Sequence, residues 1–200
     1  MVRPLTALVA TAALACATEA TMTDAERSKA LKLMTDSQTE FLDSVRGLSE
    51  AQWSFKASPE KWSIAETSEH IMLSESLIFS AVMGNKKAPV DSEWEAKTAA
   101  KVALIESALP DRSTKVKAPE VLQPKSKFTR DQIITRYQAA RQKTIDFTKT
   151  TDFPLKEHLL PHPLFGPLNG YEWLLSVALH NHRHNLQIAE VKAAAGYPAN

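Results

Sequence analysis

Near its C-terminus the chain reads His180-Asn-His-Arg-His184-Asn-Leu-Gln187-Ile188, within a helical pattern that runs from Tyr171 to about Ala195. The apolar seam of this pattern advances in steps of three and four residues, as one core-facing stripe of a helix does. Residues four apart are neighbours on a helix surface, so His180 and His184 can point at one spot and supply two ligands to a divalent metal. The full seam is Trp173, Val177, His180, His184, Ile188 and Val191.

The same two histidines have a structural interpretation. A buried histidine can be a neutral, hydrogen-bonded core residue, and an H-x-x-x-H pair alone does not define a metal site. The metal interpretation therefore requires a third ligand from elsewhere in the chain. His182 is not that ligand, because at about 100° per residue it lies roughly 160–200° around the helix from both neighbours. We expect His182 on the surface or on a second seam.

The composition indicates one globular domain. The chain has 200 residues, of which 44% are apolar and 24% charged, enough for a sizeable core. Its net charge of +1 gives no electrostatic reason to expect nucleic acid as a partner. Only 5 glycines occur, and the long periodic runs contain few helix breakers, which favours an all-helical fold over a sheet.

Residues 1–20 differ from the rest of the chain. Arg3 precedes a short apolar run from Leu5, and Ala15-Cys16-Ala17 places small residues where a signal peptidase reads them. The run is too short to span a bilayer. We therefore expect an export signal, an exported (periplasmic or extracytoplasmic) mature chain and no integral membrane span; a frayed N-terminal helix is the alternative. Cys16, the only cysteine, faintly resembles a lipidation site, and cleavage after Ala17 would leave no thiol in the mature chain.

Residues 21–200 are predicted to form one domain with four long amphipathic helices. Each helix begins at a capping residue or capping box, and the last ends at a glycine and a proline. The starts are Thr23, Ser63-Ile-Ala-Glu66, Thr129-Arg-Asp-Gln132 and Asn169, and the expected stops are near Gly47, Gly84 and Gly196 with Pro198.

Three connections join these helices. Residues 53–59 read as a loop with aromatic anchors, and residues 151–169 read as a proline-rich loop whose His158 and His162 we expect on the surface. Residues 85–128 form a long, lysine- and proline-rich crossover that contains a short helix at 93–109 and otherwise reads as solvated. Four long helices and one long crossover predict a four-helix bundle.

His70 supplies the third candidate ligand. It lies near the start of the second helix, from which it could meet His180 and His184 across the core. Bundle cores are where metal sites are built from facing helices. Three neutral imidazoles leave coordination positions open, as catalytic zinc sites do. Taken alone, His70 is more often a half-buried structural histidine than a ligand.

Four segments follow one another in a distinctive order along the chain. They are Lys61-Trp-Ser-Ile-Ala-Glu-Thr-Ser-Glu-His70, Ala118-Pro119 to Pro124, His162-Pro-Leu-Phe-Gly-Pro167 and His180-x-x-x-His184-x-x-Gln187-Ile188. Together they resemble the DinB-like (DinB/YfiT-like) superfamily, and the resemblance covers most of the mature chain. In that family the fold is an up-down-down-up four-helix bundle, and members often bind nickel, zinc or another divalent cation through three histidines. Carried over to this sequence, those ligands are His70, His180 and His184.

Three functions remain open at this point. The first is an exported metal-dependent enzyme such as a hydrolase, with a substrate of unknown chemistry; Glu66 would be its base, although the capping role explains Glu66 more simply. The second, which the resemblance implies, is an S-transferase that uses bacillithiol or mycothiol; export argues against it, because such thiols are kept reduced in the cytosol. The third is a non-enzymatic module that binds a metal or small ligand. The sequence leaves open whether two copies pair as a homodimer.

Overall fold

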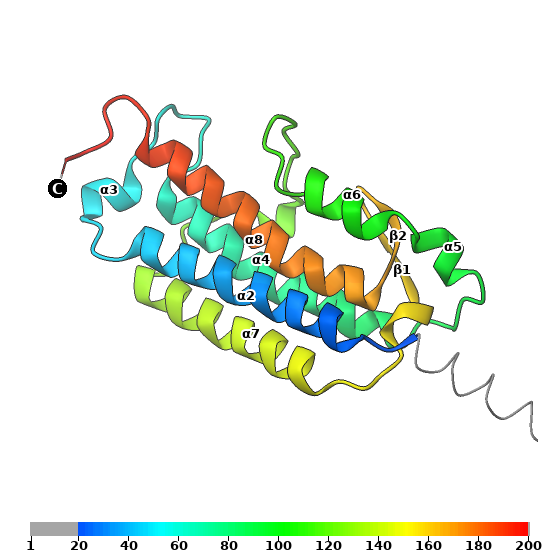
Figure 1. Cartoon of the computed structure of the whole chain (residues 1–200). Coiled ribbons are helices and arrows are strands. Elements are labelled where there is room, and N and C mark those ends of the chain that lie inside the picture. Colours follow the sequence, from blue (N-terminus) through cyan, green and yellow to red (C-terminus); the bar gives the residue numbers. More distant parts are fainter. Residues whose placement is uncertain (1–19, 200) are drawn as a thin grey trace, which may run out of the picture.

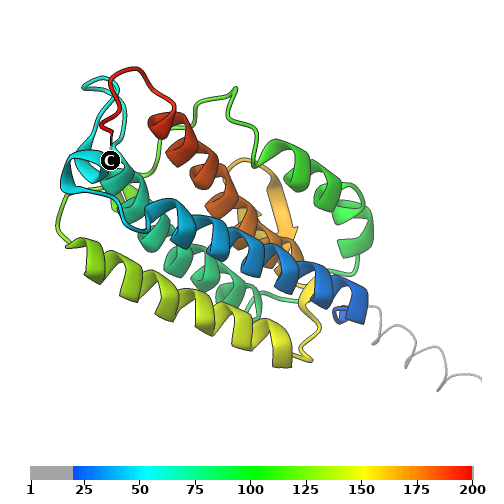
Figure 2. The same cartoon turned by 60° about the vertical axis from the view of Figure 1, so that its left-hand side comes forward.

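The computed structural model describes residues 20–199, and these form a bundle of four long helices. Helices α2 (Asp24–Val45) and α8 (Gly170–Lys192) run in one direction, and α4 (Ile64–Asn85) and α7 (Arg130–Thr150) run in the other. Each of α2 and α4 packs against both α7 and α8, as Figures 1 and 2 show. This arrangement is the predicted up-down-down-up four-helix bundle. The predicted export segment lies outside the described residues except for Ala20.

All four predicted helix starts are confirmed as capping boxes. In each, the side chain of the capping residue accepts a hydrogen bond from the third helical residue, whose own side chain accepts one from the capping backbone. Thr23 pairs with Glu26, Ser63 with Glu66, Thr129 with Gln132, and Asn169 with Glu172. Helix α8 ends at Lys192, slightly before the predicted Ala195.

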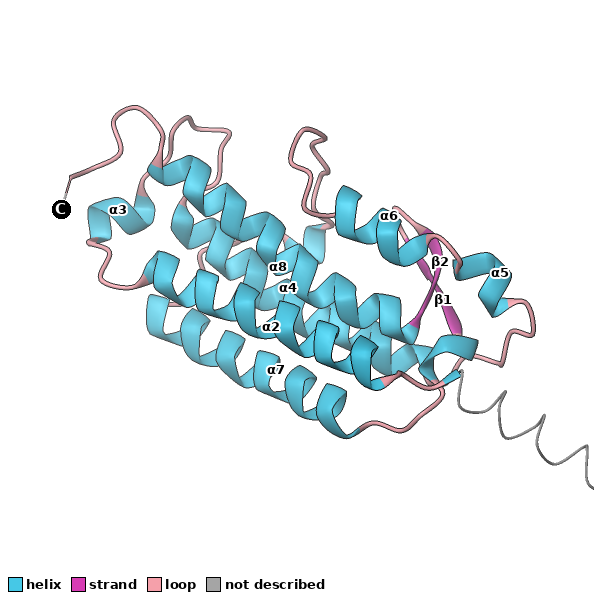
Figure 3. Cartoon of the chain, viewed as in Figure 1, coloured by secondary structure: helices cyan, strands magenta, loops and turns pink. Residues whose placement is uncertain are grey.

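The connections contain more regular structure than the sequence indicated, as Figure 3 shows. Part of the predicted loop at 53–59 belongs to a short helix, α3 (Glu50–Ser54), which buries Trp53. The single helix predicted at 93–109 is two, α5 (Trp94–Thr98) and α6 (Lys101–Ala108). A 3-10 turn, η1 (Glu120–Leu122), precedes α7.

The prediction that residues 151–169 form only a loop is wrong. They contain a 3-10 turn, η2 (Leu155–Glu157), and an antiparallel hairpin of β1 (Leu159–His162) and β2 (Gly166–Asn169). Pro161 and Pro167 face each other in this hairpin. Facing residues in an antiparallel pair alternate between positions that exchange hydrogen bonds and positions that do not, so two prolines can face each other at the latter without loss.

The expectation that His158 and His162 lie on the surface is also wrong. His158 is buried, its Nδ1 donates to the carbonyl oxygen of Ala88 at 2.6 Å, and its ring stacks on Phe153. His162 is half-buried and stacks on Phe165. Both rings lie where the hairpin packs against the bundle, and proline-rich sequence alone does not reveal that contact.

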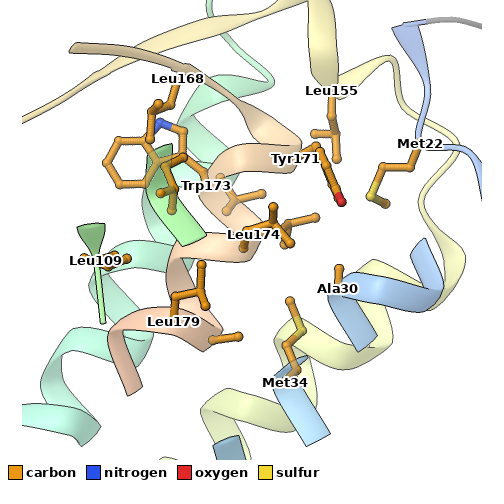
Figure 4. Packing of buried hydrophobic residues seen from close by; sticks show 14 of the residues in the cluster. Met22, Ala30, Met34, Leu109, Leu155, Leu168, Tyr171, Trp173, Leu174 and Leu179 are labelled. Carbon is orange, nitrogen blue, oxygen red and sulfur yellow. The ribbon is translucent and has the colours of Figure 1, made fainter. Parts of the chain in front are cut away.

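Apolar packing fills both ends of the bundle. At one end, shown in Figure 4, Leu155, Tyr171 and Leu174 face Met22 and Met34. A second cluster lies toward the other end and includes Phe41, Trp53, Ile64, Ile133 and Ile188. Within residues 20–199, no helix has the length and apolar character that a membrane span needs.

A buried ion pair lies where the four long helices meet. The guanidinium of Arg141 on α7 donates from Nε and Nη2 to the two carboxylate oxygens of Glu75 on α4, at 2.7 and 2.8 Å. Its Nη1 donates to the carbonyl oxygen of Met34 and to Ser37 Oγ on α2, at 2.8 and 2.9 Å. The side chains of Arg141 and Glu75 are 0% and 1% exposed. Such a pair is tolerated only when the remaining donors are satisfied, as they are here.

Candidate metal centre

The structure brings His70, His180 and His184 together. His180 and His184 lie one turn apart on α8, and His70 projects from the adjacent helix α4. One ring nitrogen from each of the three lies within 4.8 Å of the others. His70 and His184 are buried and His180 is half-buried. No other group of three or more histidine, cysteine or carboxylate ligands gathers in this way among residues 20–199.

Hydrogen bonds fix which nitrogen is free in the rings of His70 and His184. His70 Nδ1 lies 2.8 Å from the carbonyl oxygen of Leu122, and His184 Nδ1 lies 2.8 Å from Gln187 Oε1. Both oxygens can only accept, so both Nδ1 atoms carry the proton in the neutral rings. The Nε2 atoms of His70 and His184, which face each other at 3.1 Å, therefore present lone pairs to the same point.

This geometry fits a divalent cation. Two lone pairs pointing at one another repel unless a positive charge lies between them. Nitrogens on one tetrahedral zinc ion, each about 2.1 Å from the metal, stand about 3.4 Å apart, close to the observed separation. Ser74 Oγ lies 3.4 Å from His70 Nε2, so its hydroxyl gives that nitrogen a weak alternative partner, and the structure shows no such donor for His184 Nε2 within the described residues.

Burial keeps the three rings neutral. Loss of solvation lowers the pKa of His70, against which the hydrogen bond to Leu122 acts. Burial, and then the charges of the neighbouring histidines, lower the pKa of His180 and of His184 well below the usual value. Neutral imidazole is the form that binds metal, so these rings can act as ligands at neutral pH without first losing a proton.

Further contacts orient the rings of His184 and His70. Gln187 Oε1, which accepts from His184, also accepts from Arg112 Nη1 at 3.3 Å, and Arg112 makes a two-pronged ion pair with Glu190 at 2.6 and 2.9 Å. Ligand histidines in metal sites characteristically donate their second N–H to such a partner. Gln187 lies three residues after His184, so helical spacing could have revealed this contact from the sequence.

The partner of His70 comes from the crossover. The carboxylate of Glu69 accepts hydrogen bonds from the backbone N–H groups of Lys125 and Ser126, at 3.1 and 2.9 Å. Ser126 has a positive φ of 52°, an uncommon conformation for a residue other than glycine. Glu69 thus fixes the segment that presents the Leu122 carbonyl to His70. No sequence pattern links these residues, which lie far apart along the chain.

A cavity of about 590 Å³ opens beside the cluster, and His184 is the member of the cluster that lines it. His184 and Gln187 line it from α8, Trp62 lines it from the segment just before α4, and residues 112–124 of the crossover close another side. The ring centres of Trp62 and His70 are 5.0 Å apart. The crossover, which we expected to be a solvated connection, is therefore a wall of the candidate site.

The remaining histidines and Glu66 lie apart from the cluster. His182 points toward α2, where its Nδ1 lies 2.8 Å from Glu40 Oε2, as its helical phase predicted. Glu66 closes the capping box with Ser63 and contacts Lys56 Nζ at 3.0 Å while lining the cavity. Burial lowers the pKa of His162 to about 4, but His162 does not belong to the three-histidine group.

The fold and site define a helical bundle with a buried three-histidine cluster beside a cavity. Residues 33–188 match the DinB superfamily, and the chain belongs to that superfamily. It is 30% identical over 172 residues to the uncharacterised protein YuaE of Bacillus subtilis (strain 168), and the similarity covers 81% of this chain and 96% of that protein. No solved structure matches the chain.

Proposed function

We propose that this protein binds one divalent metal ion through His70, His180 and His184. The observation that carries the proposal is the pair of Nε2 lone pairs held face to face at 3.1 Å by hydrogen bonds at both Nδ1 atoms. A core that used these histidines only structurally would pair each ring nitrogen with a donor or acceptor of its own. Nickel and zinc are among the metals that imidazole ligands suit.

We further propose that the bound metal serves an enzyme reaction on a small molecule. Three ligands leave coordination positions open, and a cavity of about 590 Å³ adjoins them, as catalytic rather than closed structural sites require. The ion would supply Lewis acidity toward a water molecule or a substrate heteroatom. Gln187 and the Leu122 carbonyl hold two of the rings in place, and Trp62 shields His70 from solvent.

The predicted export of the chain favours hydrolysis over thiol transfer. Low-molecular-weight thiols are kept reduced in the cytosol and are scarce as reduced cofactors outside it. If the N-terminal segment is not a cleaved export signal and the protein stays in the cytosol, a bacillithiol- or mycothiol-dependent S-transferase becomes the better proposal. A non-enzymatic binding role is less favoured, because a sequestering site needs a fourth protein ligand, and the ligand cluster within residues 20–199 consists of three histidines alone.

The test is metal content by mass spectrometry on protein purified without a histidine tag. We expect close to one ion per chain in the wild type and loss of that ion in His70→Ala and in His184→Ala. His182→Ala is the matched control, because it lies on the same helix and should keep the metal. Circular dichroism should show a folded bundle in all variants.

Two results would contradict the proposal. One is a wild type that takes up no nickel or zinc and whose stability does not change with a chelator. The other is a metal that survives both His70→Ala and His184→Ala but is lost from His182→Ala.

A further inference from the structure

The cavity beside the three histidines is lined by an excess of positive charge. Eight charged side chains reach it, and only Glu60, Glu66 and Glu190 are acidic. The chain as a whole has a net charge of only +1, so the excess is concentrated at this site. The basic residues are Lys61, Arg112, Lys115, Lys117 and Arg183.

The acidic groups do not neutralise all of these cations. Glu190 is occupied by Arg112, and Glu66 is occupied by the capping box and by Lys56. Lys61, Lys115 and Lys117 form no ion pair within residues 20–199. Five basic and three acidic side chains leave the lining with two positive charges in excess, and such an excess attracts an anion into the cleft that it lines.

Hydrogen bonds hold in place the crossover segment that carries Lys115 and Lys117. Arg183 on α8 donates to the carbonyl oxygens of Leu109 at 3.2 Å, Asp111, and Thr114 at 2.7 Å. Arg112 anchors the same segment to Glu190. The chain that leaves α6 is thus tied down over α8 (Figure 2), and Lys115 and Lys117 follow directly after the last of these contacts.

Apolar side chains share the cavity with the charges. Trp62 and Val116 line it from opposite segments, and Val191 lines it from α8. An aromatic ring and two aliphatic groups suit the body of an organic molecule, whereas the lysines suit an oxyanion at one end of it. The cavity volume of about 590 Å³ is that of a small-molecule site.

We propose that this cavity binds a small organic anion, a carboxylate or phosphate ester, through Lys61, Lys115 and Lys117. Trp62 and Val116 contact its apolar part. This rests on the proposed function in one respect, namely that the far end of the molecule reaches the metal; the anion site itself exists with or without the ion.

The test compares two fluorescent probes of nearly the same shape, anilinonaphthalene sulfonate and the uncharged phenylnaphthylamine. Their dissociation constants are measured on wild-type protein and on the double variant Lys115→Gln/Lys117→Gln. The matched control is Lys143→Gln/Lys149→Gln, two exposed lysines on α7. Metal content is measured in parallel on each protein. A failure of the metal proposal can then be distinguished from a failure of the anion proposal.

We expect the anionic probe to bind wild type more tightly than the neutral one. Removal of each lysine should weaken the anionic probe about fivefold, the effect of roughly 1 kcal/mol of charge interaction in a solvated site, with no change for the neutral probe. The α7 control should match wild type, and added salt should reduce the preference. Equal binding of both probes to wild type, or an anion preference as large in Lys115→Gln/Lys117→Gln as in wild type, would overturn the proposal.

Competitors identify the anionic group. Benzoate and phenyl phosphate are tested for displacement of the sulfonate probe, with benzyl alcohol as the neutral comparison. Displacement by benzoate at lower concentration supports a carboxylate, and displacement by phenyl phosphate at lower concentration supports a phosphate. Displacement by benzyl alcohol at the same concentration as both anions contradicts an anion site.

Discussion

At His184 the two ring nitrogens have different roles. Nδ1 donates to Gln187 at 2.8 Å, and Nε2 faces His70 Nε2 at 3.1 Å. The hydrogen bond at one nitrogen therefore determines that the other carries a lone pair. The same holds at His70, where the Leu122 carbonyl takes the place of Gln187.

Gln187→Ala should weaken metal binding without abolishing it. The ring of His184 would lose the acceptor that fixes its tautomer and orientation, and loss of such a partner typically lowers metal affinity about 10- to 100-fold. The affinity is measured by competition with a chelator of known strength. Gln142→Ala on the exposed face of α7 is the control and should bind metal as wild type does. An unchanged affinity in Gln187→Ala would show that this contact does not orient the ligand.

At this scale the sequence predicted that His70, His180 and His184 gather at one point, but not the hydrogen-bond partners of their rings. The four-residue step from His180 to His184 follows from helical geometry alone. The pairing of His70 with Leu122 depends on how the crossover folds back onto α4 through Glu69. Such a contact between distant segments produces no periodic pattern in the sequence. The position of the lysines around the cavity could not be predicted for the same reason.

The capping box at the start of α8 contains a buried carboxyl group, that of Glu172. Glu172 accepts a hydrogen bond from the Asn169 N–H at 2.9 Å, and its side chain is almost fully buried. Burial raises the pKa of Glu172 to about 7, against the opposing effects of that hydrogen bond and of Lys101. Because this pKa is raised in the folded state, the protein loses stability as the pH rises from the usual pKa of 4.5 to about 7, above which the buried carboxyl is ionised.

Glu172→Gln should be more stable than wild type at pH 8 but not at pH 4. Glutamine keeps the capping hydrogen bond and cannot ionise. The gain should develop between the usual pKa of 4.5 and about 7 and reach at most about 3 kcal/mol. Urea unfolding across this pH range measures it, with Glu26→Gln at the more exposed cap of α2 as the comparison. A constant difference at every pH would contradict a buried, ionising Glu172.

The β1–β2 hairpin shows why some elements could not be predicted from the sequence. Pro161 and Pro167 are ordinarily signs of a loop, yet they face each other where no ladder bond is needed. The four capping boxes, by contrast, are local signals and located the helix starts correctly. Local chemistry is readable from the sequence, whereas pairing between segments depends on the assembled fold.

One buried ion pair, between Arg141 and Glu75, contacts all four long helices of the bundle. Arg141 spans from Glu75 on α4 to Met34 and Ser37 on α2, and also donates to Asn181 on α8 at 3.3 Å. All four long helices therefore meet at this guanidinium. Arg141 continues the core-facing stripe of α7 from Ile133 and Tyr137 in four-residue steps, which is the sequence signal that marks it as buried.

Arg141→Met should destabilise the protein by about 3–5 kcal/mol, because it leaves the Glu75 carboxylate buried without a counter-charge. The double variant Arg141→Met/Glu75→Leu should recover much of that loss, since both charges are then absent. Denaturant unfolding measures wild type, Arg141→Met, Glu75→Leu and the double variant. A double variant that loses as much stability as the sum of both single changes would show that the pair does not act as a unit.

The central claim is that three histidines from two helices hold one metal ion, and anomalous diffraction from crystals grown with zinc tests it most directly. The account predicts that the strongest anomalous peak lies about 2.0–2.2 Å from one ring nitrogen of each of His70, His180 and His184. A strongest peak at other residues, or full-length crystals with no peak among these three rings, would contradict it.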